Sequence, residues 1–207
     1  MIMKKYDTVI FDLDGVLIDS KKNMRNSWGH VKKKMKLSQS FKKYFDLIGY
    51  PFERILNKIG IFNDINKIKK IYQTQSIFNL KYVKIHKDVI QTLETLKKNK
   101  IKLGLVTSKD IKRTKIIIKK FKIPIKTIIS PRKKLRGKPF PDQIFLALKK
   151  LMSSKKKTCY VGDMLVDFKA AQNAKVGFIF ADYGYGEKKN YFKKIIYKPR
   201  DILKFTI

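Results

Sequence analysis

Short runs of apolar and β-branched residues recur along this 207-residue chain, with a helical pattern between one run and the next. This alternation constrains the fold most, because strands separated by helices form parallel sheets with helices on both faces. The runs are TVIF (8–11), IKLGLVTS (101–108), IKTIIS (125–130), TCYVGD (158–163) and VGFIFAD (176–182), and the expected helices span 87–99, 109–121, 140–152 and 165–174. The sequence therefore predicts an α/β protein with a Rossmann-like, doubly wound parallel sheet.

One stretch, from residue 20 to residue 85, breaks this alternation. Its apolar residues fall at three- and four-residue spacing, as at Ile55, Ile59, Ile65 and Ile68, and it contains no convincing strand. We therefore expect an all-helical cap domain at 20–85, inserted into a core domain formed by 1–19 and 86–207. A chain of this length is large enough for one domain that carries such an insert.

Polar residues follow the predicted strands at the points where the strands end. They are Asp12 and Asp14 after the first strand, Thr107 and Ser108 after the second, Lys138 between the third and fourth, and Asp163 and Asp167 after the fourth. The carboxyl ends of parallel strands share one edge of a sheet, so we expect these side chains to converge there. Clustered carboxylates favour Mg²⁺, and hydroxyl, ammonium and backbone N–H groups suit a phosphate. In such a site Asp12 would attack phosphorus and Asp14 would transfer protons.

The segments DLDGVLIDS, VTS, KPFPD and VGDMLVD resemble, in order, the four motifs of the haloacid dehalogenase (HAD) superfamily, in particular its phosphatases with a helical cap. The resemblance covers nearly the whole chain and implies a Mg²⁺-dependent phosphomonoester hydrolase. It implies the following roles: Asp12 as the nucleophile, Asp14 as the general acid and base, Thr107 and Lys138 as phosphate ligands, and Asp12, the Asp14 carbonyl, Asp163 and Asp167 around the metal. The later segment GYGE (184–187) is similar to a turn in phosphoglycolate phosphatase-like members.

Other branches of this superfamily carry out different chemistry. Dehalogenases lack the second aspartate of the first motif, so Asp14 disfavours cleavage of a carbon–halogen bond. The β-phosphoglucomutase branch is the serious alternative, because it shares Val16 and Trp28. That branch has a histidine where this chain has Met24 and an arginine where it has Phe52, so we expect net hydrolysis rather than phosphomutase activity.

The substrate is expected to be a small phosphorylated metabolite, of the phosphoglycolate or sugar phosphate type. Gly15 would let the backbone approach the phosphoryl group, and Ser108 is either a phosphate contact or the N-cap of the next helix. In the loop IGYPFER (48–54) the candidate substrate contacts are Tyr50, Phe52 and Arg54. Packing of Tyr50 and Phe52 in the core is an equally good interpretation.

The charge of the chain is strongly positive, with 50 Lys and Arg against 16 Asp and Glu, for a net charge of +34. Such an excess suggests a polyanion partner or a nucleic-acid end phosphatase. However, 44 of the basic residues are Lys and only six are Arg. Base recognition favours Arg, and Lys, Ile, Asn, Phe and Tyr all have A/T-rich codons. Genome composition therefore explains the charge at least as well as a nucleic-acid partner does, and binding of a polyanion or hydrolysis of nucleic-acid ends is kept as the second alternative.

Cys159 is the only cysteine, which excludes an internal disulfide and a metal site of several cysteines. It lies in a predicted buried strand and is expected to be a small core residue. No segment approaches the length of a membrane span, and the N-terminal apolar run is too short for a signal peptide. We expect a cytoplasmic monomer or homodimer that does not bind membranes.

Overall fold

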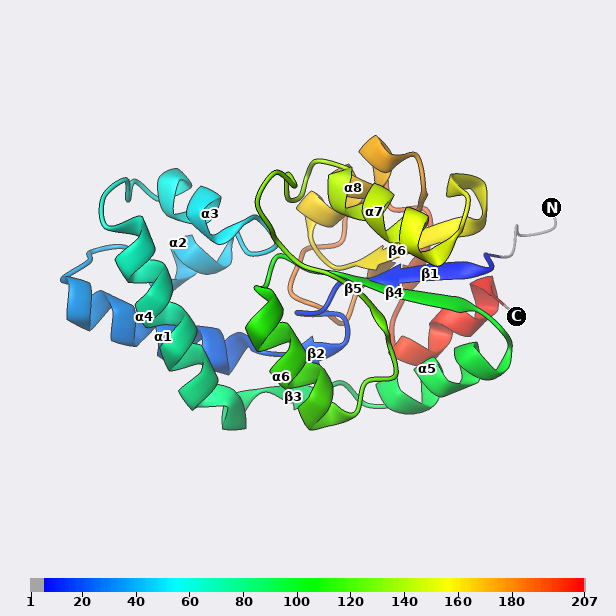
Figure 1. The fold of residues 1–207 in the computed structure, drawn as a ribbon, viewed down its shortest axis with the longest axis horizontal. Coiled ribbons are helices and arrows are strands. Elements are labelled where there is room, and N and C mark those ends of the chain that lie inside the picture. The colour runs from blue at the N-terminus through cyan, green and yellow to red at the C-terminus, as the bar shows by residue number, and fades with distance from the viewer. Residues whose placement is uncertain (1–5, 207) are drawn as a thin grey trace.

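The computed structural model describes residues 6–206, in which six strands form one sheet with helices on both faces (Figure 1). The strand order is β5-β4-β1-β6-β7-β8, and every neighbouring pair is parallel. The strands are β1 (Thr8–Phe11), β4 (Lys102–Val106), β5 (Thr127–Ile129), β6 (Thr158–Gly162), β7 (Gly177–Ala181) and β8 (Ile195–Ile196). The strand order reverses next to β1, and in such sheets a ligand binds at the carboxyl edge beside that point.

Alternate side chains of the central strand enter two separate hydrophobic clusters. Val9 and Phe11 of β1 belong to one cluster, and Ile10 belongs to the other. The first cluster is covered by α5 (Val89–Lys98), α6 (Ile111–Phe121) and the 3₁₀ helix η3 (Pro199–Phe205), and the second by α7 (Asp142–Leu151) and α8 (Leu165–Ala174). Because β1 is buried on both faces, its sequence is continuously apolar rather than alternating.

The predicted doubly wound sheet is confirmed. Each of the five predicted strands and four predicted helices is present, with ends within two residues of the expected ones. Cys159 is a fully buried core residue, as predicted. Among residues 6–206, no helix is long and apolar enough to cross a membrane.

Four helices lie together beside the sheet, on the left of Figure 1. They are α1 (Lys21–Met35), α2 (Phe41–Phe45), α3 (Phe52–Lys58) and α4 (Ile65–Phe78). They surround a third hydrophobic cluster, in which the rings of Trp28 and Tyr44 stack at 4.6 Å. The helical character predicted for this stretch agrees with the structure, and we propose that it forms a cap bounded near residues 20 and 85.

The prediction that 20–85 contains no strand is wrong at its end. Two-residue strands β2 (Ile18–Asp19) and β3 (Lys84–Ile85) pair antiparallel as a short ribbon where the chain enters and leaves the four helices. The sequence also did not indicate β8. Segments of two residues are too short to show the period-two alternation that identifies a strand.

Candidate active site

Three carboxylates meet at the carboxyl edge of the sheet. Asp12 follows β1, Asp163 follows β6, and Asp167 lies in the first turn of α8. One oxygen of each lies within 4.8 Å of the others, and all three side chains are buried. The doubly wound topology thus brings together residues that are more than 150 positions apart, as the sequence predicted.

Lys138 joins this acidic cluster from the loop between β5 and α7. Its ammonium group donates hydrogen bonds to Oδ1 of Asp12 at 3.0 Å and to Oδ1 of Asp167 at 2.6 Å. Burial disfavours the charged ammonium, but Asp12 and Asp167 outweigh this effect and raise the pKa of Lys138 well above its usual value. Lys138 therefore remains a cation although it is fully buried.

One ammonium group cannot balance three buried carboxylates. Burial raises the pKa of Asp12 to about 7, although Lys138 lowers it, and burial together with Asp167 and Asp12 raises the pKa of Asp163 well above its usual value. Oδ1 of Asp163 is buried without a hydrogen-bond partner among the described residues. These residues fit a hard divalent cation, which would neutralise the cluster and use the unpaired oxygen as a ligand.

Gly15 leaves room for this cluster. Its φ of +87° lies in the left-handed region, and a Cβ atom there would overlap the carboxylate of Asp163. Gly15 therefore brings the backbone of the first motif against Asp163, next to the place where the phosphoryl group is expected.

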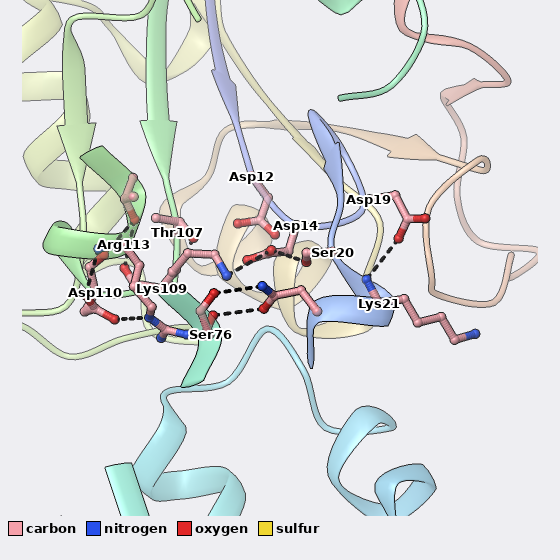
Figure 2. Close-up of polar contacts among 12 residues, drawn as sticks. Asp12, Asp14, Asp19, Ser20, Lys21, Ser76, Thr107, Lys109, Asp110 and Arg113 are labelled. Atoms are coloured by element: carbon pink, nitrogen blue, oxygen red, sulfur yellow. Dashed lines mark hydrogen bonds and ion pairs between the residues drawn. The ribbon is translucent and has the colours of Figure 1, made fainter. Parts of the chain in front are cut away.

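The carboxylate of Asp14 is not part of the acidic cluster and instead points toward Ser20 and Lys109 (Figure 2). Its Oδ1 accepts a 2.5 Å hydrogen bond from Ser20 Oγ and lies 3.1 Å from the Lys109 ammonium. The side chain is thus free of the proposed metal position, and only its carbonyl is left for the metal role that the resemblance implied. A carboxylate held apart from the ion suits a group that transfers protons.

Thr107 and Ser108 follow β4, but their side chains make different contacts. Thr107 is buried, and its hydroxyl accepts a 3.1 Å hydrogen bond from the Lys109 backbone N–H. The Ser108 hydroxyl donates to the Gly49 carbonyl at 2.5 Å, which links the strand end to the loop before α3. The N-cap of α6 is Asp110, so the helix-capping interpretation of Ser108 is wrong.

Two small cavities adjoin at this edge, and Asp14, Met24 and Ser108 line both. The first, of about 30 Å³, is also lined by Asp12, Thr107 and Lys138, and we call it the inner cavity. The second, of about 50 Å³, is the outer cavity; its lining includes Tyr50, Phe52, Tyr44, Tyr72, Lys109 and Arg113. Met24, the residue that the sequence comparison aligned with the histidine of the mutase branch, lines both cavities, and its thioether cannot transfer a proton.

The structure separates the three cap residues that the sequence suggested as substrate contacts. Tyr50 and Phe52 line the outer cavity and also pack against the cluster between the four helices. Arg54 lines neither small cavity, because its guanidinium stacks on Tyr50 at 5.1 Å and Phe140 at 5.8 Å.

Sequence reasoning missed three residues at this edge. Lys109 and Arg113 are buried cations of the outer cavity, four positions apart around the start of α6. The backbone N–H of Tyr185, in the Gly-rich turn at 184–187, donates to Asp163, and its hydroxyl contacts Asp19 and Ser20. The position of Lys109 two residues after Thr107 was the one signal that distinguished it from the other lysines.

The fold and the acidic cluster define a hydrolase of the HAD type. The family model of haloacid dehalogenase-like hydrolases matches residues 9–181, so the chain belongs to this family, as its four motifs indicated. Among curated relatives, pyrophosphatase PpaX of Oceanobacillus iheyensis is 31% identical over 179 residues, which cover 82% of this chain and 80% of that protein. The chain is therefore an enzyme of a hydrolase family whose relatives include a pyrophosphatase.

Solved structures share the same fold over nearly their whole length. A hydrolase from Pseudomonas syringae has a TM-score of 0.86 at 23% identity, covering 95% of this chain and 96% of that one. A predicted phosphoglycolate phosphatase from Haemophilus somnus has a TM-score of 0.81 at 23% identity and covers 98% of both chains. At this identity the likeness establishes the fold.

Proposed function

We propose that this protein is a Mg²⁺-dependent phosphatase that hydrolyses a small phosphorylated metabolite through a phospho-aspartyl intermediate. The observation that supports this proposal most strongly is the buried hydrogen bond from the Lys138 ammonium to Asp12. It lies in the same cluster as Oδ1 of Asp163, which has no hydrogen-bond partner among the described residues. Asp12, the Asp14 carbonyl and Asp163 would hold the ion, with Asp167 beside them. When bound, Mg²⁺ would offset the charge of the carboxylates and of the phosphate.

The residues of the inner cavity divide the reaction into two steps. In the first, an oxygen of Asp12 attacks phosphorus, the bond to the leaving oxygen breaks, and Asp14 donates a proton to that oxygen. In the second, Asp14 takes a proton from water, the water oxygen attacks phosphorus, and the bond to Asp12 breaks. Lys138 and the Thr107 hydroxyl would balance the negative charge on the phosphoryl oxygens during both steps.

The relatives suggest where a substrate search begins. One is named a pyrophosphatase and one solved structure a predicted phosphoglycolate phosphatase, so inorganic pyrophosphate and phosphoglycolate are the first candidates. Phosphoglycolate is of the type that the sequence predicted, whereas pyrophosphate is suggested by the relative alone. The family also fits a cytoplasmic enzyme that acts on metabolites.

Phosphate release from p-nitrophenyl phosphate tests the proposed activity. We expect turnover with Mg²⁺, loss of turnover with EDTA, and recovery when Mg²⁺ is added back. Asp12→Asn keeps the size of the side chain and removes the nucleophile, so we expect turnover to fall by at least about 10³-fold. Turnover that survives EDTA or the Asp12→Asn substitution would falsify the proposed mechanism.

A further inference from the structure

The outer cavity contains two buried cations next to the place where the leaving group departs. Lys109 and Arg113 line it, and their side chains are 5% and 9% exposed. Asp14, the proposed proton donor, lies between this cavity and the inner one. A group that leaves phosphorus and takes the proton of Asp14 therefore arrives beside Lys109 and Arg113.

The guanidinium group of Arg113 is fixed in place from two directions. The Asp110 carboxylate accepts hydrogen bonds from the backbone N–H of Arg113 and from its Nε. It therefore caps α6 and fixes the orientation of the Arg113 side chain. The ring of Tyr72, from α4, lies under the guanidinium at 5.3 Å, and Gln73 of the same helix donates to Asp110 at 3.2 Å. Such contacts pre-organise a guanidinium for an anion.

Lys109 reaches the cavity from the loop before α6 (Figure 2). Its ammonium group contacts Asp14 at 3.1 Å, and its backbone N–H holds the Thr107 hydroxyl at 3.1 Å. Burial of two cations is unfavourable unless each has an anionic partner. Asp14 and Asp110 supply one partner each, and Arg113 has five N–H donors, of which Asp110 uses one side-chain donor.

The dimensions limit what the leaving group can be. The inner and outer cavities measure about 30 and 50 Å³, an order of magnitude below the roughly 300–1,000 Å³ of pockets that hold drug-sized ligands. Tyr44, Tyr50, Phe52 and Tyr72 line the outer cavity with aromatic surface. A groove of about 460 Å³ lies beyond Phe52 and Arg113, but none of the strand-end aspartates lines it.

We propose that Lys109 and Arg113 form a subsite for a small leaving group that carries its own negative charge. This inference rests on the proposed phosphatase function and narrows its substrate class to compounds with a second anionic group, a phosphoryl or a carboxylate, one small unit away from the reacting phosphorus. For a diphosphate, the bond from Asp12 to phosphorus forms as the bridging P–O bond breaks, and orthophosphate leaves with the Asp14 proton. Water then releases the second orthophosphate from Asp12 and returns a proton to Asp14.

Matched substrates test the subsite in the unmodified enzyme with Mg²⁺. The leaving group of phosphoglycolate carries a carboxylate, and that of 2-hydroxyethyl phosphate carries a neutral hydroxymethyl group at the same place. Inorganic pyrophosphate is the third substrate, and its leaving group carries a phosphoryl group. We expect kcat/KM for at least one anionic substrate to exceed that for 2-hydroxyethyl phosphate by about 100-fold, as the pairing of a buried charge allows. The better anionic substrate then identifies the group as carboxylate or phosphoryl.

Arg113→Gln provides the second measurement. We expect kcat/KM for the preferred anionic substrate to fall by about 100-fold and that for 2-hydroxyethyl phosphate by less than about tenfold, with Arg113→Lys intermediate. Arg25→Gln removes an exposed guanidinium on α1 and should leave both values unchanged. Equal losses on all substrates would assign Arg113 a purely structural role and overturn the subsite.

The comparison of substrates in the wild-type enzyme tests the subsite even if the Arg113 variants do not fold. Equal kcat/KM for charged and neutral leaving groups, or a preference for nucleotides, would overturn the subsite while the phosphatase function stands. Absence of phosphate release from every ester would instead overturn the proposed function, and the subsite with it.

Discussion

Oδ2 of Asp163 accepts a 2.7 Å hydrogen bond from the backbone N–H of Tyr185, whereas Oδ1 of the same carboxylate has no partner among the described residues. The turn at 184–187 therefore holds one oxygen of Asp163 and leaves the other available to the proposed cation. The hydroxyl of Tyr185 also donates to Asp19 and accepts from the Ser20 N–H. One residue thus connects the acidic cluster with the chain that enters α1.

Gly186→Ala should weaken the proposed metal site. A Cβ atom at Gly186 would overlap the backbone carbonyl of Asp163, so the turn must shift and move the hydrogen bond that orients Asp163. We expect the Mg²⁺ concentration for half-maximal turnover to rise by about tenfold, as happens when groups that orient metal ligands are lost.

Gly29→Ala is the matched control for this substitution. Gly29 lies inside α1, and nothing lies within 4 Å of the position of its Cβ. Alanine there should raise the free energy of unfolding by about 0.5–1 kcal/mol without changing the Mg²⁺ requirement. An unchanged Mg²⁺ requirement in Gly186→Ala would show that the turn does not position Asp163.

Lys138→Met should destabilise the protein when no metal is present. The substitution leaves the buried carboxylates of Asp12 and Asp167 without their cation, which costs about 3–5 kcal/mol. Lys138 lowers the pKa of Asp12, so without it this pKa rises further above its unfolded-state value, and more stability is lost as the pH rises. In urea unfolding with EDTA, the unfolding free energy of the variant should therefore fall further below that of the wild type at pH 8 than at pH 5.

Lys149→Met, on the exposed side of α7, should change the unfolding free energy by less than about 0.5 kcal/mol. If the stability that Lys138→Met loses relative to the wild type does not depend on pH, the loss comes from packing rather than from unpaired carboxylates.

Asp110 should contribute stability that acid removes. Burial disfavours its carboxylate, but Arg113 outweighs this effect and lowers the pKa of Asp110 below its ordinary value of 3.8. A group with a lowered folded-state pKa stabilises the protein above its unfolded-state pKa and loses this effect as the pH falls through the folded-state value. Asp110→Asn keeps a good N-cap and removes the charge.

We expect Asp110→Asn to be less stable than the wild type at pH 7 and the difference to shrink once the pH falls below about 3.8. Chemical unfolding of both proteins between neutral pH and pH 2 measures this difference. A constant difference over the whole range would show that the Asp110 charge does not stabilise the fold.

The thiol of Cys159 should not react in the folded protein. The residue is fully buried in β6, and burial raises the pKa of its thiol far above the ordinary value, so thiolate is scarce. We expect Ellman's reagent to report one thiol in denaturant and none in buffer over the same period. Rapid reaction in buffer would show that β6 opens readily.

The sheet and the acidic cluster could be predicted because each rests on a strong local signal. TVIF at 8–11 is a continuous apolar run that ends at Asp12, and β1 has the same bounds. Once the strands are known to be parallel, their carboxyl ends must share an edge, so Asp12, Lys138 and Asp163 meet. The four ordered motifs carried the same information.

The other features of the site could not be predicted, because they depend on where individual side chains point. Lys109 and Arg113 belong to a chain with 50 basic residues, and apart from the place of Lys109 two residues after Thr107, no spacing separates these buried cations from the solvated ones. Arg54 fits a loop that faces the site, but its guanidinium finds two aromatic rings instead. The carboxylate of Asp14 turns toward Ser20 and Lys109 because those partners reach it, which the period of two along a strand does not reveal.

The paired segments β2 and β3 also determine how the four helices can shift against the sheet. The outgoing and returning chains are hydrogen-bonded to each other, so they form one strip rather than two independent tethers. Such a strip flexes readily perpendicular to its plane and resists sideways shear, which would break its hydrogen bonds. A swing of α1–α4 would thereby be restricted to something close to a single axis, and Phe52 would return to the same position in the lining of the outer cavity, which Asp14 shares.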